Sequence, residues 1–233
     1  MTDDTKGGGA GGYASPPCMA HEIDPTYFDP LGVEAQQARD VARWRRAERG
    51  RLLEARRALG VEGIRAVGAA LVRHVGDALA ARIGSRRDLV VSVYWPIKSE
   101  PDLRPLMQDL TERGLRVALP LVETKRAPLV FREWTPRTRM QRGDWNIPVP
   151  PPDAPELRPD IALAPLVGWD DGGYRLGYGG GYFDRTLAAL APRPYTIGVG
   201  FQSARLTTIY PQPHDMALDA IVTEAGAQQI RHR

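Results

Sequence analysis

The stretch of this 233-residue chain with the clearest chemistry interleaves six glycines with arginine, tyrosine and aspartate: Asp170-Asp-Gly-Gly-Tyr-Arg-Leu-Gly-Tyr-Gly-Gly-Gly-Tyr-Phe-Asp184. Glycines let the backbone adopt positive φ and approach a ligand closely. A helix that begins just afterwards would offer unpaired N–H groups to an anion. Arg175 adds a fork of donors that fits phosphate, and Asp184 adds a hard oxygen ligand for Mg²⁺. We therefore predict that the loop at 168–181 binds a phosphate group; a surface loop with glycines for flexibility is the alternative.

This loop matches neither of the two common phosphate-binding patterns. The P-loop requires a Gly-Lys dipeptide, and the chain contains none. The dinucleotide-binding fingerprint requires glycine where Tyr182 stands, and an acidic residue about 20 positions later. The sequence therefore indicates a phosphate loop of a different kind.

A second cationic cluster lies far upstream, in a predicted helix at 32–58, and consists of Arg43, Arg45, Arg46, Arg49 and Arg51. Arg45 and Arg49 are four positions apart and share one helix face. That face is either solvated or directed at a polyanion, so a nucleic-acid-binding protein is one candidate function. The modest net charge of +3, the interspersed acidic residues and the lack of an aromatic stacking platform argue against it.

The elements that would position these groups alternate between strand and helix. Apolar spacing predicts further helices at 64–82, 102–112 and 182–190. Apolar runs predict strands at 89–94, 115–121, 129–134, 161–167, 195–200 and 219–222. The strand at 129–134 is expected to pair with the segment that follows it, and the prolines of 148–155 favour an extended crossing. The alternation predicts an α/β fold, with a mainly parallel sheet flanked by helices in a single three-layer domain.

Composition sets the outer bounds of the function. The chain is 42% hydrophobic and 25% charged, as is typical of globular proteins. Cys18 is the only cysteine, which excludes an intramolecular disulfide and a cysteine zinc cage. No apolar run approaches the roughly 18–20 residues of a membrane span, and the N-terminus does not resemble a signal peptide, so we expect a cytoplasmic monomer. Residues 1–38 are predicted to form a flexible tail before a domain at 39–228.

One block resembles the signature of a known family. Arg175-Leu-Gly-Tyr-Gly-Gly-Gly-Tyr-Phe-Asp-Arg185 is similar to the glycine motif of the 5-formyltetrahydrofolate cyclo-ligase family. Weaker matches occur in the family's order: Arg45-Arg-Ala-Glu-Arg49, Tyr94-Trp-Pro-Ile-Lys-Ser-Glu100, Val117-Ala-Leu-Pro120, Phe131-Arg-Glu-Trp134, His214-Asp-Met216 and Thr223-Glu224. The resemblance covers roughly 43–225.

The resemblance implies an α/β ligase that uses ATP and Mg²⁺ and acts on a reduced folate. In that reaction the formyl oxygen of 5-formyltetrahydrofolate is phosphorylated, N10 attacks the activated carbon, and ring closure releases phosphate. The products are 5,10-methenyltetrahydrofolate, ADP and phosphate. Such phosphoryl transfer requires positioning and charge neutralisation rather than a covalent nucleophile. The chain has the cations for this, and it lacks a Gly-x-Ser-x-Gly nucleophile elbow.

The resemblance also implies roles for individual residues. Those assigned to ATP are Arg45, Arg49, Arg175, Leu176, Gly177, Tyr178, Gly179, Gly180, Gly181, Tyr182 and Phe183. Asp184 and Asp215 would bind Mg²⁺, and Trp95 and Glu100 would contact the folate. Glu100 would orient the reacting formamide end and would be catalytic together with Arg175 and Tyr182. Tyr178 and Gly180 stand at positions that are basic in some members, and a relative with a different substrate remains an alternative.

Overall fold

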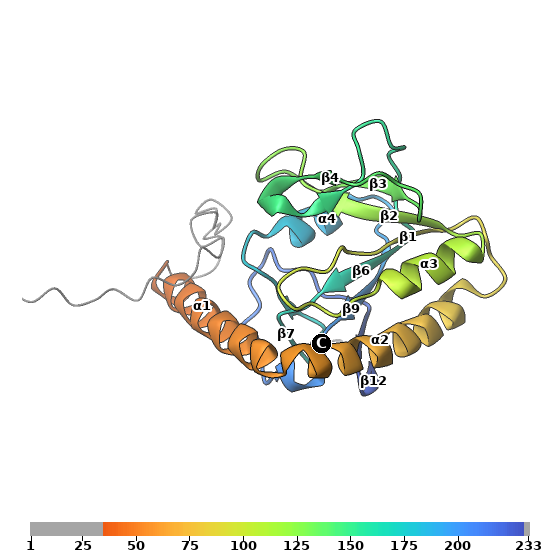
Figure 1. Cartoon of the computed structure of the whole chain (residues 1–233). Coiled ribbons are helices and arrows are strands. Elements are labelled where there is room, and N and C mark those ends of the chain that lie inside the picture. The colour runs from red at the N-terminus through yellow and green to blue at the C-terminus, as the bar shows by residue number, and fades with distance from the viewer. Residues whose placement is uncertain (1–34, 231–233) are drawn as a thin grey trace, which may run out of the picture.

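The computed structural model describes residues 35–230, which form an α/β fold around one large sheet (Figure 1). The sheet has seven strands in the order β12-β11-β9-β6-β1-β2-β3. Their bounds are β1 Val90–Ser92, β2 Arg116–Leu121, β3 Val130–Trp134, β6 Ile161–Pro165, β9 Tyr195–Val199, β11 Ala220–Thr223 and β12 Gly226–Gln228. The five central strands are parallel and each edge strand is antiparallel to its neighbour. The predicted mainly parallel sheet is confirmed.

Helices cover both faces of this sheet. They are α1 Ala35–Ala58, α2 Gly60–Ile83, α3 Arg104–Glu112 and α4 Tyr182–Ala189. Leu163 of β6 packs in the same apolar cluster as the buried residues of α2 and α3. The flanking Ala162 and Ala164 point to the opposite face, where they join the cluster that contains Leu187 of α4. Because successive strand side chains alternate between faces, the two clusters define the three predicted layers.

Helix α1 buries a stripe in which two of the four residues are arginines. Val41, Arg45, Leu52 and Arg56 are the buried members, and they are spaced by four, seven and four positions. This spacing keeps them on one helix face. The helix begins at Ala35, so the last residues of the predicted 1–38 tail are helical; residues 1–34 lie outside the described part.

Two local predictions were wrong, and a third was incomplete. Strand β3 does bond to the segment that follows it, through an isolated bridge between Arg132 and Glu156. Its main ladder, however, is a hairpin with β2, which precedes it and is joined to it by the short turn at 122–129. In place of a plain extended crossing, β4 (Gln141–Arg142) and β5 (Pro148–Val149) form a two-stranded ribbon around a 3-10 turn at Asp144–Asn146.

The glycine-rich stretch is also not one continuous loop. Its first half forms a hairpin of β7 (Gly168–Asp170) and β8 (Arg175–Leu176). Strand β10 (Arg205–Leu206), which follows a 3-10 turn at Gln202–Ala204, pairs with β7. Gly172 and Gly173 therefore turn a hairpin, and only residues 177–181 form a free loop before α4.

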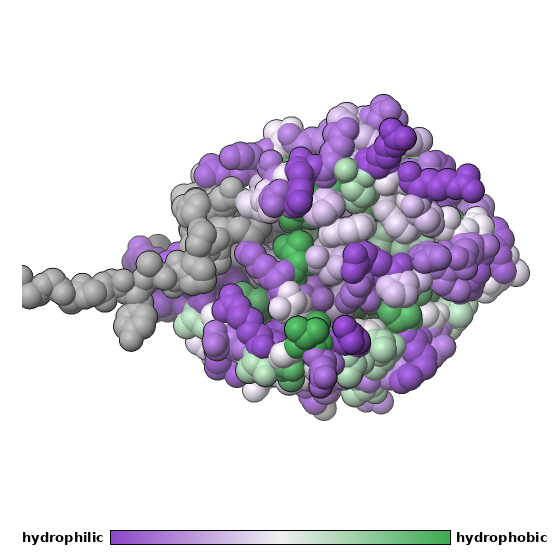
Figure 2. Space-filling view, in the orientation of Figure 1, coloured by the Kyte–Doolittle hydropathy of each residue, from purple (hydrophilic) through white to green (hydrophobic). Residues whose placement is uncertain are grey.

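Hydrophilic side chains cover most of the visible surface (Figure 2). On the face shown in Figure 2, hydrophilic residues dominate and hydrophobic ones are scattered among them. No helix within residues 35–230 has the length and apolar character needed to cross a membrane.

Candidate active site

The loop at 177–181 needs glycine for two different reasons. Gly179 and Gly181 have φ of 106° and 62°, which residues with a side chain seldom adopt. A Cβ at Gly177 would lie 2.7 Å from Nη1 of Arg175. The loop thus ends at Gly181, whose left-handed backbone directly precedes α4, and at Gly177 it passes close to the Arg175 guanidinium.

A cavity of about 180 Å³ opens beside this loop. Its lining comes from three separate parts of the chain: Ala42, Arg45, Arg49, Leu129, residues 175–185, His214 and Asp215. All residues predicted to contact ATP line it, and so do both predicted Mg²⁺ ligands. The structure therefore brings together groups that are far apart in sequence, such as Arg45 and Asp215, which are separated by 170 positions.

Arg45 and Asp215 both line this cavity and form a buried ion pair. Nη1 of Arg45 donates to Oδ1 of Asp215 at 3.2 Å, and Nη2 donates to Oδ2. Arg45 also donates to the carbonyls of Ile209 and Tyr210, each at 2.9 Å. Asp215 accepts a further bond from the backbone of Gln212 at 2.6 Å. Each charge is thus compensated by the other, as burial requires.

A second buried pair joins Arg175 to Asp184. Nη2 of Arg175 donates to Oδ2 of Asp184 at 2.8 Å, and the guanidinium lies 4.8 Å from the centre of the Phe183 ring. Nε of Arg175 is buried and has no hydrogen-bond partner in the described part of the chain. Oδ1 of Asp184 accepts a bond from the backbone of Met216 at 3.3 Å, which places the Asp184 carboxylate next to the Asp215 segment.

Arg49 fixes the loop to α1. Its Nε donates to the carbonyl of Gly177 at 2.7 Å. A Cβ at Gly179 would meet its guanidinium carbon at 3.4 Å. Tyr182 lines the same cavity, and its hydroxyl accepts a bond from the backbone of Arg126 at 3.3 Å.

Glu100 is buried at the end of a strained turn after β1. Lys98 and Ser99 have φ of 47° and 63°, and the turn closes when Glu100 N–H donates to the Ile97 carbonyl at 2.8 Å. The side chain folds back, and its Oε2 accepts from Ile97 N–H at 2.9 Å. The residue is 6% exposed, and burial raises the pKa of its carboxyl to about 7, against the opposing effects of the Ile97 N–H, Arg56, Tyr178 and Lys98. Two consecutive residues other than glycine thus have a left-handed backbone, and such strain is found mostly at functional sites.

The predicted folate-side residues stand apart from the loop cavity. Neither Trp95 nor Glu100 lines it, and the Trp95 ring lies 5.4 Å from the Arg104 guanidinium. Tyr178 makes the connection, because it lines the cavity and also acts electrostatically on Glu100. Nζ of Lys98 lies 5.2 Å from the centre of the Tyr178 ring.

Comparison with known proteins agrees with this arrangement. A model of the 5-formyltetrahydrofolate cyclo-ligase family matches residues 41–224. The chain belongs to this family. The prediction drawn from the glycine motif is confirmed, and the family is one of ligases.

Curated relatives carry the cyclo-ligase name. The chain is 34% identical to the 5-formyltetrahydrofolate cyclo-ligase of Mycolicibacterium smegmatis over 143 residues, which cover 57% of this chain and 72% of the relative. It is 30% identical to the Escherichia coli protein of the same name over 139 residues, with 57% and 76% covered.

Solved structures named 5,10-methenyltetrahydrofolate synthetase share the fold. The Aquifex aeolicus protein superposes with a TM-score of 0.66 at 26% identity, covering 80% of this chain and 93% of its own. The Mycoplasma pneumoniae protein gives a TM-score of 0.60 at 22% identity, covering 77% and 98%. The predicted fold class is confirmed.

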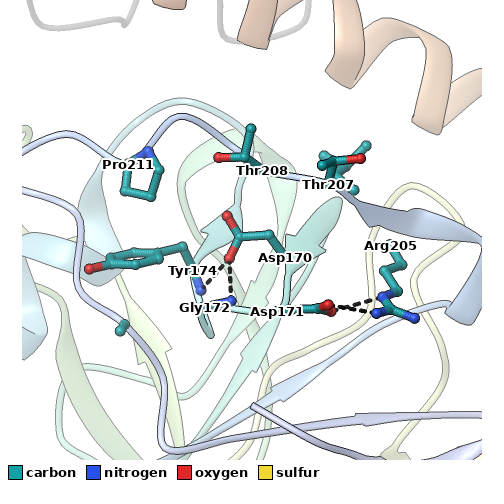
Figure 3. A pocket seen from close by; sticks show the side chains of 10 residues that line it. Asp170, Asp171, Gly172, Tyr174, Arg205, Thr207, Thr208 and Pro211 are labelled. Atoms are coloured by element: carbon teal, nitrogen blue, oxygen red, sulfur yellow. Dashed lines mark hydrogen bonds and ion pairs between the residues drawn. The ribbon is translucent and has the colours of Figure 1, made fainter. Parts of the chain in front are cut away.

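A larger hollow of about 770 Å³ is lined by the β7–β8 hairpin and the 205–211 segment and shares no lining residue with the loop cavity. Figure 3 shows that its charges are internally satisfied. Asp170 accepts from the backbone N–H groups of Gly172, Tyr174 and Ile209. Asp171 pairs with Arg205 through two hydrogen bonds of 2.8 and 2.6 Å. These contacts fold the hairpin onto the 205–211 segment.

Sequence reasoning missed Arg56, which is buried beside Glu100, and did not single out His214 and Arg185, which line the cavity. Arg56 was detectable in principle, because it continues the helix face of Arg45 and Arg49 by seven positions. Three of the five exposed arginines of α1 form ion pairs three positions back along the helix: Arg43 with Asp40, Arg51 with Glu48 and Arg57 with Glu54. This neutralised face disfavours the nucleic-acid alternative.

Proposed function

We propose that this chain is an ATP- and Mg²⁺-dependent 5-formyltetrahydrofolate cyclo-ligase. The observation that carries the proposal is the single cavity in which a glycine loop, four arginines and two aspartates meet, with Tyr178 leading from it to the buried Glu100. An anion site with this many cations suits a triphosphate. The family relatives named above support the substrate assignment.

The triphosphate would lie along the loop at 177–181. Backbone N–H groups at the start of α4 offer donors and the positive end of the helix dipole. Arg49, already fixed to the loop through Gly177, is placed to contact the phosphates. Arg45 and Arg175 would add guanidinium forks, each turning part of its hydrogen bonding from a carboxylate toward phosphate.

The two carboxylates that those arginines now hold fit a magnesium ion in donor chemistry. Within residues 35–230 no group of three or more His, Cys, Asp or Glu is arranged to hold a metal. Magnesium sites of nucleotide enzymes, however, commonly use one or two carboxylates together with phosphate oxygens and water. Asp184 and Asp215 would hold Mg²⁺ in this way, and the ion would neutralise charge on the phosphates.

On the folate side, Glu100 would accept a hydrogen bond from the substrate and hold the formamide end in line with the γ-phosphate. Its turn is closed by two hydrogen bonds to Ile97, so the carboxylate is pre-positioned. Trp95, half-buried five residues earlier, would pack against the folate rings. Tyr182 would border both ligands from the start of α4.

The chemistry then follows in two transfers. The formyl oxygen attacks the γ-phosphorus, and the bond to the ADP oxygen breaks. N10 attacks the activated formyl carbon, the N10 proton is lost, and the carbon–oxygen bond breaks to release phosphate and close the ring. The arginines and loop N–H groups stabilise the charge that develops on the transferring phosphoryl group. We further propose that the enzyme acts as a cytoplasmic monomer.

The test is turnover of purified protein with 5-formyltetrahydrofolate, ATP and Mg²⁺, followed by the near-ultraviolet absorbance of the methenyl product and by ADP release. We expect product that requires both ATP and Mg²⁺. Folded protein that binds ATP but forms no methenyl product would instead indicate a family member with a different substrate.

A further inference from the structure

Arg56 is a buried charge that the proposed contacts with ATP, Mg²⁺ and folate leave unused. It is 4% exposed, although it is the fourth arginine after Arg45 and belongs to a helix otherwise rich in solvated arginines. Its Nη2 donates to the Leu166 carbonyl at 2.5 Å, and its guanidinium lies 4.8 Å from the centre of the Phe201 ring. Its Nη1 is buried with no hydrogen-bond partner within residues 35–230. A buried donor left unpaired is costly and calls for an explanation.

The position of Arg56 in the fold suggests that explanation. Leu166 directly follows β6, Phe201 follows β9, and the Glu100 turn follows β1. These three strands are neighbours in the sheet and run parallel. Ligands of open α/β sheets bind outside the carboxyl ends of such strands. Arg56 is thus held at the end of the sheet where a ligand is expected.

A second buried polar group lies close to it. The Tyr178 hydroxyl makes no hydrogen bond of ordinary geometry within the described residues. Both Arg56 and Glu100 act on Tyr178, whose pKa burial raises well above its usual value. Arg56, Tyr178 and Glu100 therefore form one junction, built from α1, the glycine loop and the β1 turn.

We propose that Arg56 is a positioning residue of this enzyme, which holds the Glu100 carboxylate and the Tyr178 hydroxyl in place and thereby joins the nucleotide loop to the folate side. This inference rests on the proposed function. Arg56 does not contact the reacting atoms; it acts through Glu100. A carboxylate buried this deeply favours its neutral form unless a cation lies nearby.

The electrostatic surroundings of Glu100 make the role measurable. The groups that face it are Arg56 from α1, Tyr178 from the glycine loop, Lys98 from its own turn and Tyr94 from the end of β1. Arg56 lowers the pKa of Glu100, as do Tyr178 and Lys98, against the larger effect of burial. Removing the Arg56 charge should therefore raise the pKa of Glu100 further.

The experiment compares Arg56→Met with Arg56→Lys and with Arg57→Met. Arg57 is the matched control, because it is the next residue on the same helix but is exposed and paired with Glu54. The Glu100 carboxyl is followed by ¹³C NMR in protein labelled at glutamate and is assigned with Glu100→Gln. The same proteins are assayed for kcat/KM toward 5-formyltetrahydrofolate as a function of pH.

We expect Arg56→Met to raise the pKa of Glu100, to move the acid limb of the kcat/KM profile to higher pH by the same amount, and to lower kcat/KM at pH 7 at least tenfold. Arg57→Met should leave all three unchanged. If Arg56→Met does not fold, Arg56→Lys carries the test. It should keep the pKa of Glu100 close to that of the wild type and lower kcat/KM less than Arg56→Met does.

Two results separate this inference from the proposed function. Loss of activity in Arg56→Met or Arg56→Lys with an unmoved Glu100 titration and an unmoved acid limb would overturn the positioning role and leave a structural one. Absence of turnover in the wild-type enzyme would overturn the proposed function, while the NMR titration would still decide whether Arg56 governs Glu100.

Discussion

The guanidinium of Arg45 and the carboxylate of Asp215 are joined by an ion pair although they lie 170 positions apart, and each side chain is about nine-tenths buried. Arg45 comes from the first described helix, and Asp215 from the segment before the last strands. Each would serve a different part of MgATP, one the phosphates and the other the metal. The pair therefore keeps two groups of opposite charge ready in the same cavity.

Removing one member of this pair should destabilise the fold. Asp215→Ala leaves the Arg45 charge buried without its partner, and breaking a buried pair in this way costs about 3 kcal/mol. Urea denaturation at pH 7.5 measures the change in the free energy of unfolding. Asp109→Ala, which breaks an exposed pair with Arg113, should change it by less than about 0.5 kcal/mol. Equal effects of the two substitutions would mean that the Arg45–Asp215 pair contributes nothing specific.

Arg49 should determine nucleotide affinity. A hydrogen bond to a charged group contributes about 1.5–3 kcal/mol, so Arg49→Met should weaken ATP binding roughly tenfold to a hundredfold. Isothermal titration calorimetry with ATP and Mg²⁺ provides the measurement. Arg51→Met is the control, since Arg51 is exposed and paired with Glu48 on the same helix. An unchanged dissociation constant for Arg49→Met would remove Arg49 from the nucleotide site.

The Gly177→Ala substitution should disturb the loop by displacing the Arg175 side chain. The new Cβ would lie 2.7 Å from Nη1 of Arg175, which is itself buried and paired with Asp184. We expect the displaced guanidinium to raise the KM for ATP by at least tenfold. Gly50→Ala, at a helical position with no atom within 4 Å of the added Cβ, should leave KM unchanged. It should also stabilise the protein by about 0.5–1 kcal/mol.

The buried Glu100 carboxylate should lower the free energy of unfolding at neutral and higher pH. Its carboxyl has a pKa of about 7 when folded, against an ordinary pKa of 4.5 for a glutamate carboxyl. Between these values the folded state binds more protons than the unfolded state, so the free energy of unfolding falls as pH rises through this window. Glu100→Gln should therefore be more stable than the wild type at pH 8, on the order of 2–3 kcal/mol, and show little difference at pH 4.

Chemical denaturation of both proteins across this pH range measures that effect. The same substitution should abolish turnover, because an amide cannot replace the carboxylate as a charged acceptor. A Glu100→Gln protein that is less stable than the wild type at pH 8 would show that the buried carboxylate is fully compensated by its neighbours.

The sequence predicted the glycine loop and the central strands more accurately than the contacts between them. Glycine spacing located residues 177–181, and apolar runs located the central strands, because both are local properties of the chain. The split of the glycine-rich stretch was not foreseeable in the same way. It involves the β7–β8 hairpin and also β10, whose residues pair with β7 residues 36 positions earlier.

Long-range pairing also explains the remaining gaps. That Arg45 meets Asp215 follows from how α1 and the closing segment dock, which no local pattern encodes. Arg56 was missed for another reason. A run of charged residues usually marks a solvated helix face, but α1 carries both buried and exposed arginines on different faces. Ion pairs with Asp40, Glu48 and Glu54 distinguish three of the exposed arginines from the buried ones.

The contacts of helix α1 determine when the cavity can form during synthesis of the chain. It supplies Arg45 to the closing segment, Arg49 to the glycine loop and Arg56 to the ends of the central strands. Most of the partners of Arg45 are made late in synthesis, at residues 209–215. A nascent chain that stops before them has no complete crevice, so we expect nucleotide affinity only after α1 and the 209–215 segment have met.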